Sequence, residues 1–108
     1  MDMIANMKKM LDDGRDDLLL RFGLGQALFK AGDHDEAAVH LARAVEHDPK
    51  HSAAWKLLGK AYAESGKDEQ AIATYEQGIR VAEDNGDIQA VKEMQVFLKR
   101  LLKSRESD

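Results

Sequence analysis

Apolar residues recur every three or four positions along most of the chain, which is the spacing of one face of an α-helix. Trp55, Leu58 and Tyr62 show this spacing clearly, and a polar segment with a glycine follows them. Similar polar segments divide the middle of the chain into four predicted helices, near 18–31, 34–47, 52–65 and 68–84. Because only about two to four residues separate these helices, we expect neighbours to pack as antiparallel hairpins.

The two predicted hairpins repeat each other at an offset of 34 residues. Residues 18–51 and 52–85 share five identical positions at this offset, where composition alone predicts about two. The pairs are Leu24 with Leu58, Gly25 with Gly59, Ala27 with Ala61, Gly32 with Gly66, and Ala37 with Ala71. Glycine at 25 and 59 allows the two helices of a hairpin to approach closely. Glycine at 32 and 66 suits a left-handed residue after a helix.

The second copy carries a recognisable motif. It reads Trp55-x-x-Leu58-Gly59-x-x-Tyr62, followed by Gly66 and then Ala71-x-x-x-Tyr75. This resembles the tetratricopeptide repeat (TPR), in which a Trp-x-x-Leu-Gly-x-x-Tyr helix precedes an Ala-x-x-x-aromatic helix and a closing proline. The first copy keeps the closing Pro49, but Arg21 stands in the tryptophan place. The second copy has Glu83 in the proline place, so its last helix is expected to run on.

The resemblance implies an all-α, right-handed solenoid of helical hairpins, with about six helices in a single domain over residues 1–108. Its expected parts are an N-terminal half-repeat helix over 3–13, repeats over 18–51 and 52–85, and a C-terminal capping helix over 88–103. The first part contains Ile4, Met7 and Leu11 at helical spacing. The last contains an apolar stripe that begins at Ile88 and is shifted out of the 34-residue frame. These two helices are expected to close the stack.

Polar residues at the predicted helix ends indicate specific caps. The expected capping residues are Asp16 or Asp17 before the helix at 18, Asp33 with Glu36 in a capping box before the next helix, Ser52 before the third and Asp87 before the last.

Composition excludes several classes of function. Sixteen Lys and Arg against twenty Asp and Glu give a net charge of −4, so the chain as a whole lacks the basic character of a nucleic-acid-binding protein. Without cysteine it has no disulfide, zinc–thiolate site or thiol nucleophile. No apolar run reaches the roughly 18 residues of a membrane span, and the first residues lack the order of a secretory signal. We expect a cytoplasmic protein.

The polar residues do not predict catalysis, a metal site or a cofactor. His40 and His47 lie on one predicted helix with Glu36, but we interpret all four histidines as surface residues or as residues with ordinary hydrogen-bond partners. The serines lack the His–Asp companions of a nucleophile. The chain is therefore expected to be neither an enzyme nor a cofactor-binding protein.

The resemblance implies a concave face that is lined mainly by the first helix of each repeat and that binds extended peptides. By this analogy, the candidate groove residues are Leu19, Phe22, Gln26 and Phe29 in the first such helix, Lys56 and Lys60 in the second, and Lys92 and Val96 in the last. The expected partner is a protein or peptide segment, acidic and with apolar anchors, which the lysines would orient. The alternative is that the two phenylalanines pack on the N-terminal helix and that the lysines are ordinary solvated residues.

One subtype of the family is not expected. Members that hold a C-terminal carboxylate use a clamp of Lys, Asn, Asn, Lys and Arg at fixed places. In this chain the first three clamp places are occupied by Phe22, Gln26 and Leu57. The last two places are occupied by Asp87 and Val91. If the shift of the last helix is included, they are occupied by Gln89 and Glu93 instead. Neither set matches, so we do not expect a receptor for heat-shock protein tails.

The distribution of charge indicates an alternative role. Residues 88–105 contain five basic side chains and one acidic side chain, whereas residues 12–17 contain four aspartates and one arginine. The two ends of the solenoid therefore carry opposite charge, which would favour a homodimer or larger assembly formed through the basic last helix. The alternative to a TPR scaffold or adaptor is thus a self-associating structural unit.

Overall fold

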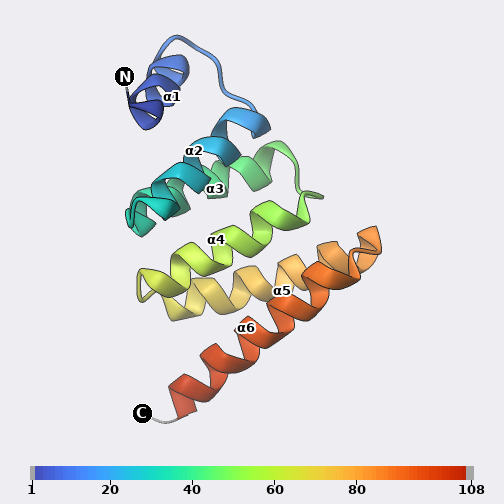
Figure 1. Cartoon of the computed structure of the whole chain (residues 1–108). Helices are drawn as coiled ribbons and strands as arrows, with labels where there is room; N and C mark the ends of the chain where they lie inside the picture. Colours follow the sequence, from blue (N-terminus) through green and yellow to red (C-terminus); the bar gives the residue numbers. More distant parts are fainter. Residues whose placement is uncertain (1, 107–108) are drawn as a thin grey trace.

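Six α-helices follow one another in the computed structural model, which describes residues 2–106 and contains no strand in that range. They are α1 (Met3–Asp12), α2 (Leu18–Lys30), α3 (His34–His47), α4 (Ser52–Glu64), α5 (Asp68–Asn85) and α6 (Ile88–Glu106). Figure 1 shows them stacked in chain order, from α1 at one end of the molecule to α6 at the other. The first five helices end within one residue of the predicted positions, and α6 runs three residues further than predicted.

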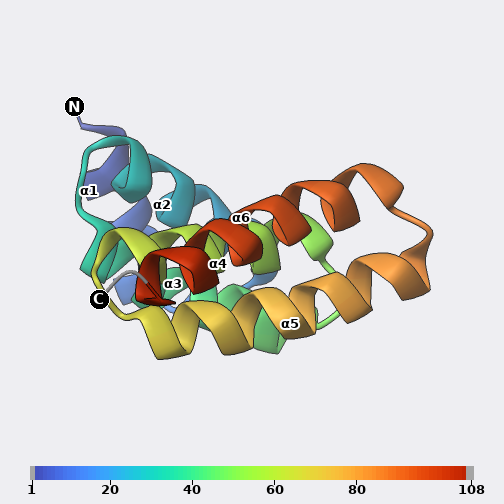
Figure 2. The same ribbon diagram turned by 90° about the horizontal axis from the view of Figure 1, so that it is seen from below.

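The helices form antiparallel pairs that pack in two layers. α2 packs on α3 and α4 packs on α5, while α3 also contacts α4 and α5 also contacts α6. Seen from below, α2, α4 and α6 form one layer, which we call the inner layer, and α3 and α5 form the other (Figure 2). All of these helices lie between residues 2 and 106, and none of them is both long enough and apolar enough to cross a membrane.

Two glycines allow the paired helices to approach closely, as the repeat pattern predicts. A Cβ atom built on Gly25 would lie 2.5 Å from the Cγ of Leu41, and one built on Gly59 would lie 2.4 Å from the Cε1 of Tyr75. Real carbon atoms do not approach so closely, so any side chain at these two positions would push α3 away from α2, or α5 away from α4.

The buried side chains form two clusters along the stack. The first surrounds the fully buried Leu24 and Leu41 and joins α2, α3 and α4. The second surrounds Tyr75 and the fully buried Met94 and joins α5 to α6. Helix α1 contributes no fully buried residue, although Ile4, with other apolar residues of α1, packs against the first cluster. The end helix α1 is therefore held by a smaller apolar contact than the four central helices.

Several helix ends match the predicted caps. Gly32 and Gly66 adopt the left-handed conformation, with φ of +85° and +75°. A side-chain oxygen of Asp17 accepts a hydrogen bond from the backbone N–H of Leu20 at 2.8 Å, and Asp87 accepts one from Ala90 at 3.2 Å. Each of these carboxylates satisfies a backbone donor that the helix leaves free in its first turn.

Two of the predicted caps are wrong. Asp33 precedes α3, but its side chain makes no capping hydrogen bond. Glu36 does not complete a capping box either, because the backbone N–H of Asp33 donates to the carbonyl oxygen of Leu28 at 2.9 Å, and Glu36 pairs with Lys8 of α1 at 2.8 Å. The cap of α4 is His51, whose Nδ1 accepts from the backbone N–H of Ala54 at 3.0 Å. Ser52 is the first residue of that helix. Its hydroxyl donates to Asp87 at 2.7 Å and thereby joins the start of α4 to the start of α6.

The position of α6 explains the shift in the 34-residue frame. Helix α3 ends at His47, just before Pro49, whereas α5 has no proline there and continues to Asn85, where Gly86 ends it. Helix α6 consequently begins two residues later than a strict 34-residue period would place it. With this shift, the eighth residue of α6 corresponds to the eighth residues of α2 and α4. Gln95 of α6 therefore stands in the place that Gly25 has in α2 and Gly59 has in α4.

Candidate functional site

A cleft of about 480 Å³ lies where α1, α2 and α4 meet, and we call it the N-terminal cleft. Gly23 lines it and has no side chain to fill it, so the cleft is open down to the backbone of α2. Its other lining residues are Met3 and Met7 of α1, Gln26, Ala27, Phe29 and Lys30 of α2, and Leu57 and Lys60 of α4. Its charged residues are Lys30 and Lys60, and none of the lining residues within 2–106 is acidic.

A second cleft of about 280 Å³ lies between α4, α5 and α6, and we call it the C-terminal cleft. Its lining residues are Lys60, Ala63, Glu64, Tyr75, Phe97, Arg100 and Leu101. Two positive side chains and one negative side chain line it. Because Lys60 lines both clefts, they meet at this side chain on the inner layer.

The ammonium group of Lys60 lies between two phenyl rings. Its Nζ atom is 5.6 Å from the ring centroid of Phe29 on α2 and 5.5 Å from that of Phe97 on α6. Each ring attracts a cation by about 0.5–1 kcal/mol at a partly exposed site. No carboxylate in residues 2–106 forms an ion pair with Lys60. The positive charge at the junction of the clefts is therefore held in place without being neutralised.

Lys56 lies one helical turn before Lys60 but is in a different situation. Its ammonium forms an ion pair with Glu93 of α6 at 3.1 Å, and both side chains are partly buried. The sequence predicts that both lysines orient an acidic partner. The structure shows that the charge of Lys56 already has a partner within the protein, so Lys60 is the stronger candidate for this role.

The other predicted groove residues do not lie together. Gln26 and Phe29 line the N-terminal cleft with Lys60. The ring of Phe22 lies 4.8 Å from that of His51 and packs against the first core cluster, whereas the alternative interpretation expects it on the N-terminal helix. Leu19 is 73% exposed. Lys92 and Val96 are exposed on α6 and do not line either cleft.

The groove also contains residues that the sequence analysis does not single out. The side of α6 that faces α4 carries Glu93, Phe97 and Arg100. Glu93 and Phe97 lie one residue after Lys92 and Val96, which the analogy assigns to the groove, and one residue corresponds to a rotation of about 100° around a helix. Met3 and Met7 also line the N-terminal cleft. They are four residues apart, which is the spacing of an apolar helix face. This spacing alone does not show whether such a residue is buried in the core or lines a cleft.

A chain of polar contacts joins α1, α2 and α3 on another part of the surface. Arg21, which stands in the tryptophan place, donates to both oxygens of Asp16 at 2.8 and 2.9 Å and to Nδ1 of His40 at 2.9 Å. Asp16 also accepts from His47, at 2.8 Å. Because Nδ1 of His40 accepts a hydrogen bond, its other ring nitrogen carries the proton and faces Glu36 at 3.5 Å. Both histidines of α3 therefore have hydrogen-bond partners within the protein.

Within this chain of polar contacts, the environment lowers the pKa values of Asp16, Glu36 and His40. Hydrogen bonds from Arg21 and His47 hold the pKa of the Asp16 carboxyl well below its usual range. The hydrogen bond from Lys8 lowers the pKa of Glu36. Burial lowers the pKa of the His40 imidazole, and the nearby positive charge of Arg21 adds to the effect. The folded protein therefore favours ionised carboxylates and a neutral His40.

These shifts predict that the protein loses stability in acid in two stages. Because the pKa of His40 is below its ordinary 6.5 when folded, the unfolded chain takes up this proton first, and stability falls as the pH decreases below 6.5. A second fall begins near the ordinary values of 4.5 for Glu36 and 3.8 for Asp16. Urea unfolding across this pH range measures both falls, and His40→Gln should remove the first. A midpoint that stays constant while His40 titrates would contradict the assignment.

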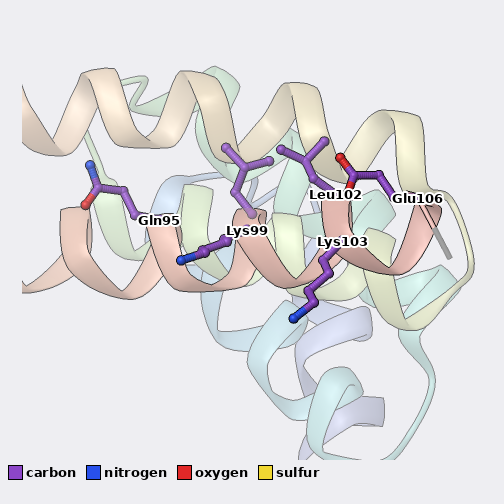
Figure 3. A pocket seen from close by; sticks show the side chains of 6 residues that line it. Gln95, Lys99, Leu102, Lys103 and Glu106 are labelled. Carbon is purple, nitrogen blue, oxygen red and sulfur yellow. The ribbon is translucent and has the colours of Figure 1, made fainter.

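The outer surface of α6 contains a shallow depression lined only by residues of that helix (Figure 3). They are Gln95, Leu98, Lys99, Leu102, Lys103 and Glu106. Leu102 is 44% exposed and turns toward α5, whereas Lys103 turns away from it (Figure 3). Gln95 occupies the place of Gly25 and Gly59, so a further helix could not approach α6 as closely as α3 approaches α2.

Between residues 2 and 106, no three His, Asp or Glu side chains come together in a group suited to a metal ion. The four histidines are instead distributed over separate contacts. His34 lies against the ring of Phe29, His51 caps α4, and His40 and His47 belong to the polar chain around Asp16.

The stacked hairpins and their continuous inner layer define a helical-repeat protein. A family model described as a tetratricopeptide repeat matches residues 28–94. A TPR repeat-containing protein of Pseudomonas aeruginosa is 52% identical over 103 residues, which are 95% of this chain and 98% of that protein. The chain therefore belongs to the tetratricopeptide repeat family.

Solved structures show the same architecture. The solution structure of a protein from Bordetella parapertussis superposes with a TM-score of 0.81 at 39% identity, covering 96% of this chain and 90% of that one. The TPR domain of Sgt2 from Aspergillus fumigatus gives a TM-score of 0.79 at 28% identity, covering 97% of this chain and 69% of that one. The TPR fold is in general a module for protein–protein interaction, and its members are typically non-catalytic.

Proposed function

We propose that this protein is a non-catalytic cytoplasmic adaptor that binds an extended segment of a partner protein along its inner layer. The observation that carries the proposal is that two largely apolar clefts meet at one lysine whose ammonium forms no ion pair with a carboxylate of residues 2–106. Apolar side chains of the partner would bury surface in the clefts and supply most of the affinity, while the positive groove would favour an acidic segment.

Filling the N-terminal cleft tests this proposal. Random peptides displayed on phage would first be selected for binding to the full chain. In the variant Gly23→Leu, the new side chain occupies the cleft beside Met7, and the selected peptides should bind at least about tenfold more weakly. The matched control Ala73→Leu adds the same side chain at an exposed position of α5 and should leave binding unchanged. If no peptide is selected, or if Gly23→Leu binds as well as the control, the groove is not the binding site.

A smaller change at the same position predicts a gain in stability. A Cβ atom on Gly23 would lie 3.6 Å from the Sδ of Met7, which is an ordinary contact distance. Because glycine is a poor helix former, Gly23→Ala should raise the free energy of unfolding by up to about 1 kcal/mol. Urea unfolding measures this directly. A loss of stability would mean that α1 packs on α2 more tightly than the structure shows.

Self-association through α6 is the second candidate function. Ile88, Val96 and Leu102 are exposed apolar residues of this helix, which also carries exposed lysines. An assembly held by the oppositely charged ends of the stack would weaken as salt screens the charges. Light scattering at low and high salt tests this, and a monomer at high protein concentration and low salt would exclude the self-associating unit.

A further inference from the structure

Lys60 is set apart from the other cations of the inner layer by its surroundings. Lys56 pairs with Glu93, whereas Lys60 faces two aromatic rings. An ammonium group has three donors, and the face of a phenyl ring attracts the charge without replacing a carboxylate as hydrogen-bond partner. Lys60 is also only partly exposed, so less water surrounds its charge than would surround a lysine on an open helix surface.

The side chains around Lys60 do not supply the missing negative charge. Among residues 2–106, the N-terminal cleft adds Lys30 and no acidic residue. The same part of the chain adds Arg100 and one acidic residue, Glu64, to the C-terminal cleft. Across the two clefts, three cations therefore face one anion. A ligand that brings a carboxylate to their junction would balance this charge.

Apolar surface lies on both sides of the charge. Phe29 borders the N-terminal cleft with Met3 and Met7, and Phe97 borders the C-terminal cleft with Tyr75. Both ring centroids lie within 5.6 Å of the Nζ atom of Lys60, so the two centroids are at most about 11 Å apart. An extended peptide covers this distance in about three to four residues. In an extended chain, alternate side chains point to the same side.

We propose that the partner segment carries an Asp or Glu side chain with an apolar residue two positions before it and another two positions after it. The carboxylate pairs with the ammonium of Lys60, and the two apolar side chains enter the N-terminal and C-terminal clefts. This inference rests on the proposed function of the inner layer and specifies the chemistry of what binds there. The anchor differs from the carboxylate clamp of the family, whose places hold other residues in this chain.

The first test uses the full chain and a pool of random peptides that are acetylated at one end and amidated at the other. Blocked ends ensure that the only carboxylates are those of side chains. The captured peptides should be enriched in Asp or Glu with apolar residues two positions away on each side. Captured peptides without an acidic preference would overturn the inference and leave the proposed function standing. If nothing is captured, both fail.

The second test is a double-mutant cycle on one captured peptide. Replacing its acidic residue by the matching amide should weaken binding to the native chain about ten- to a hundredfold, since a charged hydrogen bond is lost. The same replacement should have no effect on binding to Lys60→Met, which keeps the apolar stem without the charge. Lys60→Arg should retain the acidic preference, and Lys50→Met, at an exposed residue outside both clefts, should behave as the native chain. An equal loss for the native chain and Lys60→Met would overturn the pairing, provided that their melting temperatures agree.

Discussion

Gly25→Ala is expected to destabilise the native protein but to be tolerated once Leu41 has been replaced by alanine. In the native chain the new Cβ would lie 2.5 Å from the Cγ of Leu41, which is fully buried and cannot move aside. Overpacking of this kind costs about 1–3 kcal/mol. Leu41→Ala alone should cost about 2–5 kcal/mol, because it leaves a cavity in the first core cluster.

The double variant should be more stable than the sum of the single effects predicts. With Leu41 shortened, the methyl group at position 25 occupies part of the cavity, and alanine is also the better helix former. Urea unfolding of the four proteins measures the coupling, which should be about 1–3 kcal/mol in favour of the double variant. Gly23→Ala, where the new methyl group meets no such obstacle, is the control for helix propensity. Additive effects would show that the close approach of α2 and α3 does not depend on Gly25.

Met94→Ala is expected to release α6 from the rest of the molecule. The side chain of Met94 is fully buried and packs against Gly78 of α5. A Cβ atom built on Gly78 would lie 2.6 Å from the Sδ atom of Met94, so the methionine side chain fills the space between α5 and α6. Its truncation should cost about 2–5 kcal/mol. Each repeat of a solenoid contacts only the adjacent repeats, so the loss should be concentrated at this end of the stack.

Amide hydrogen exchange distinguishes a local from a global effect of Met94→Ala. Amides of α6 should exchange much faster, while those of α2 and α3 should keep most of their protection. Phe97 and Arg100 would leave the C-terminal cleft together with α6, so peptide binding should weaken as well. Met10→Ala, at an exposed residue of α1, is the control and should have little effect. Equal loss of protection in all helices would mean that the molecule unfolds as one cooperative unit.

The sequence predicts the helices well because their limits depend on local chemistry. Apolar spacing places the elements, and left-handed glycines at Gly32 and Gly66 end two of them. The capping residues were harder to predict. A single-sequence pattern at Asp33 and Glu36 fits a capping box, but it contains no information about Lys8, which lies on another helix and pairs with Glu36.

The candidate groove was predicted only in part, for a geometric reason. A family analogy places residues on α2 and α4 correctly enough to find Phe29 and Lys60. It already includes the two-residue shift at α6 when it assigns Lys92 and Val96 to the groove. The residues of α6 that face α4 nevertheless lie one position later, at Glu93 and Phe97, which corresponds to a rotation of about 100° around the helix. The pairing of Lys56 with Glu93 depends on that orientation and on the conformations of both side chains. Neither can be obtained from spacing within one helix.

Helix α1 forms one wall of the N-terminal cleft, yet none of its residues is fully buried. Weakly packed elements open before the rest of a protein as the temperature rises. Heating would therefore remove Met3 and Met7 from the cleft while the central hairpins are still folded. The temperature at which the protein stops capturing peptides should then lie below the temperature at which it melts, and a bound peptide that touches these methionines should bring the two temperatures closer together.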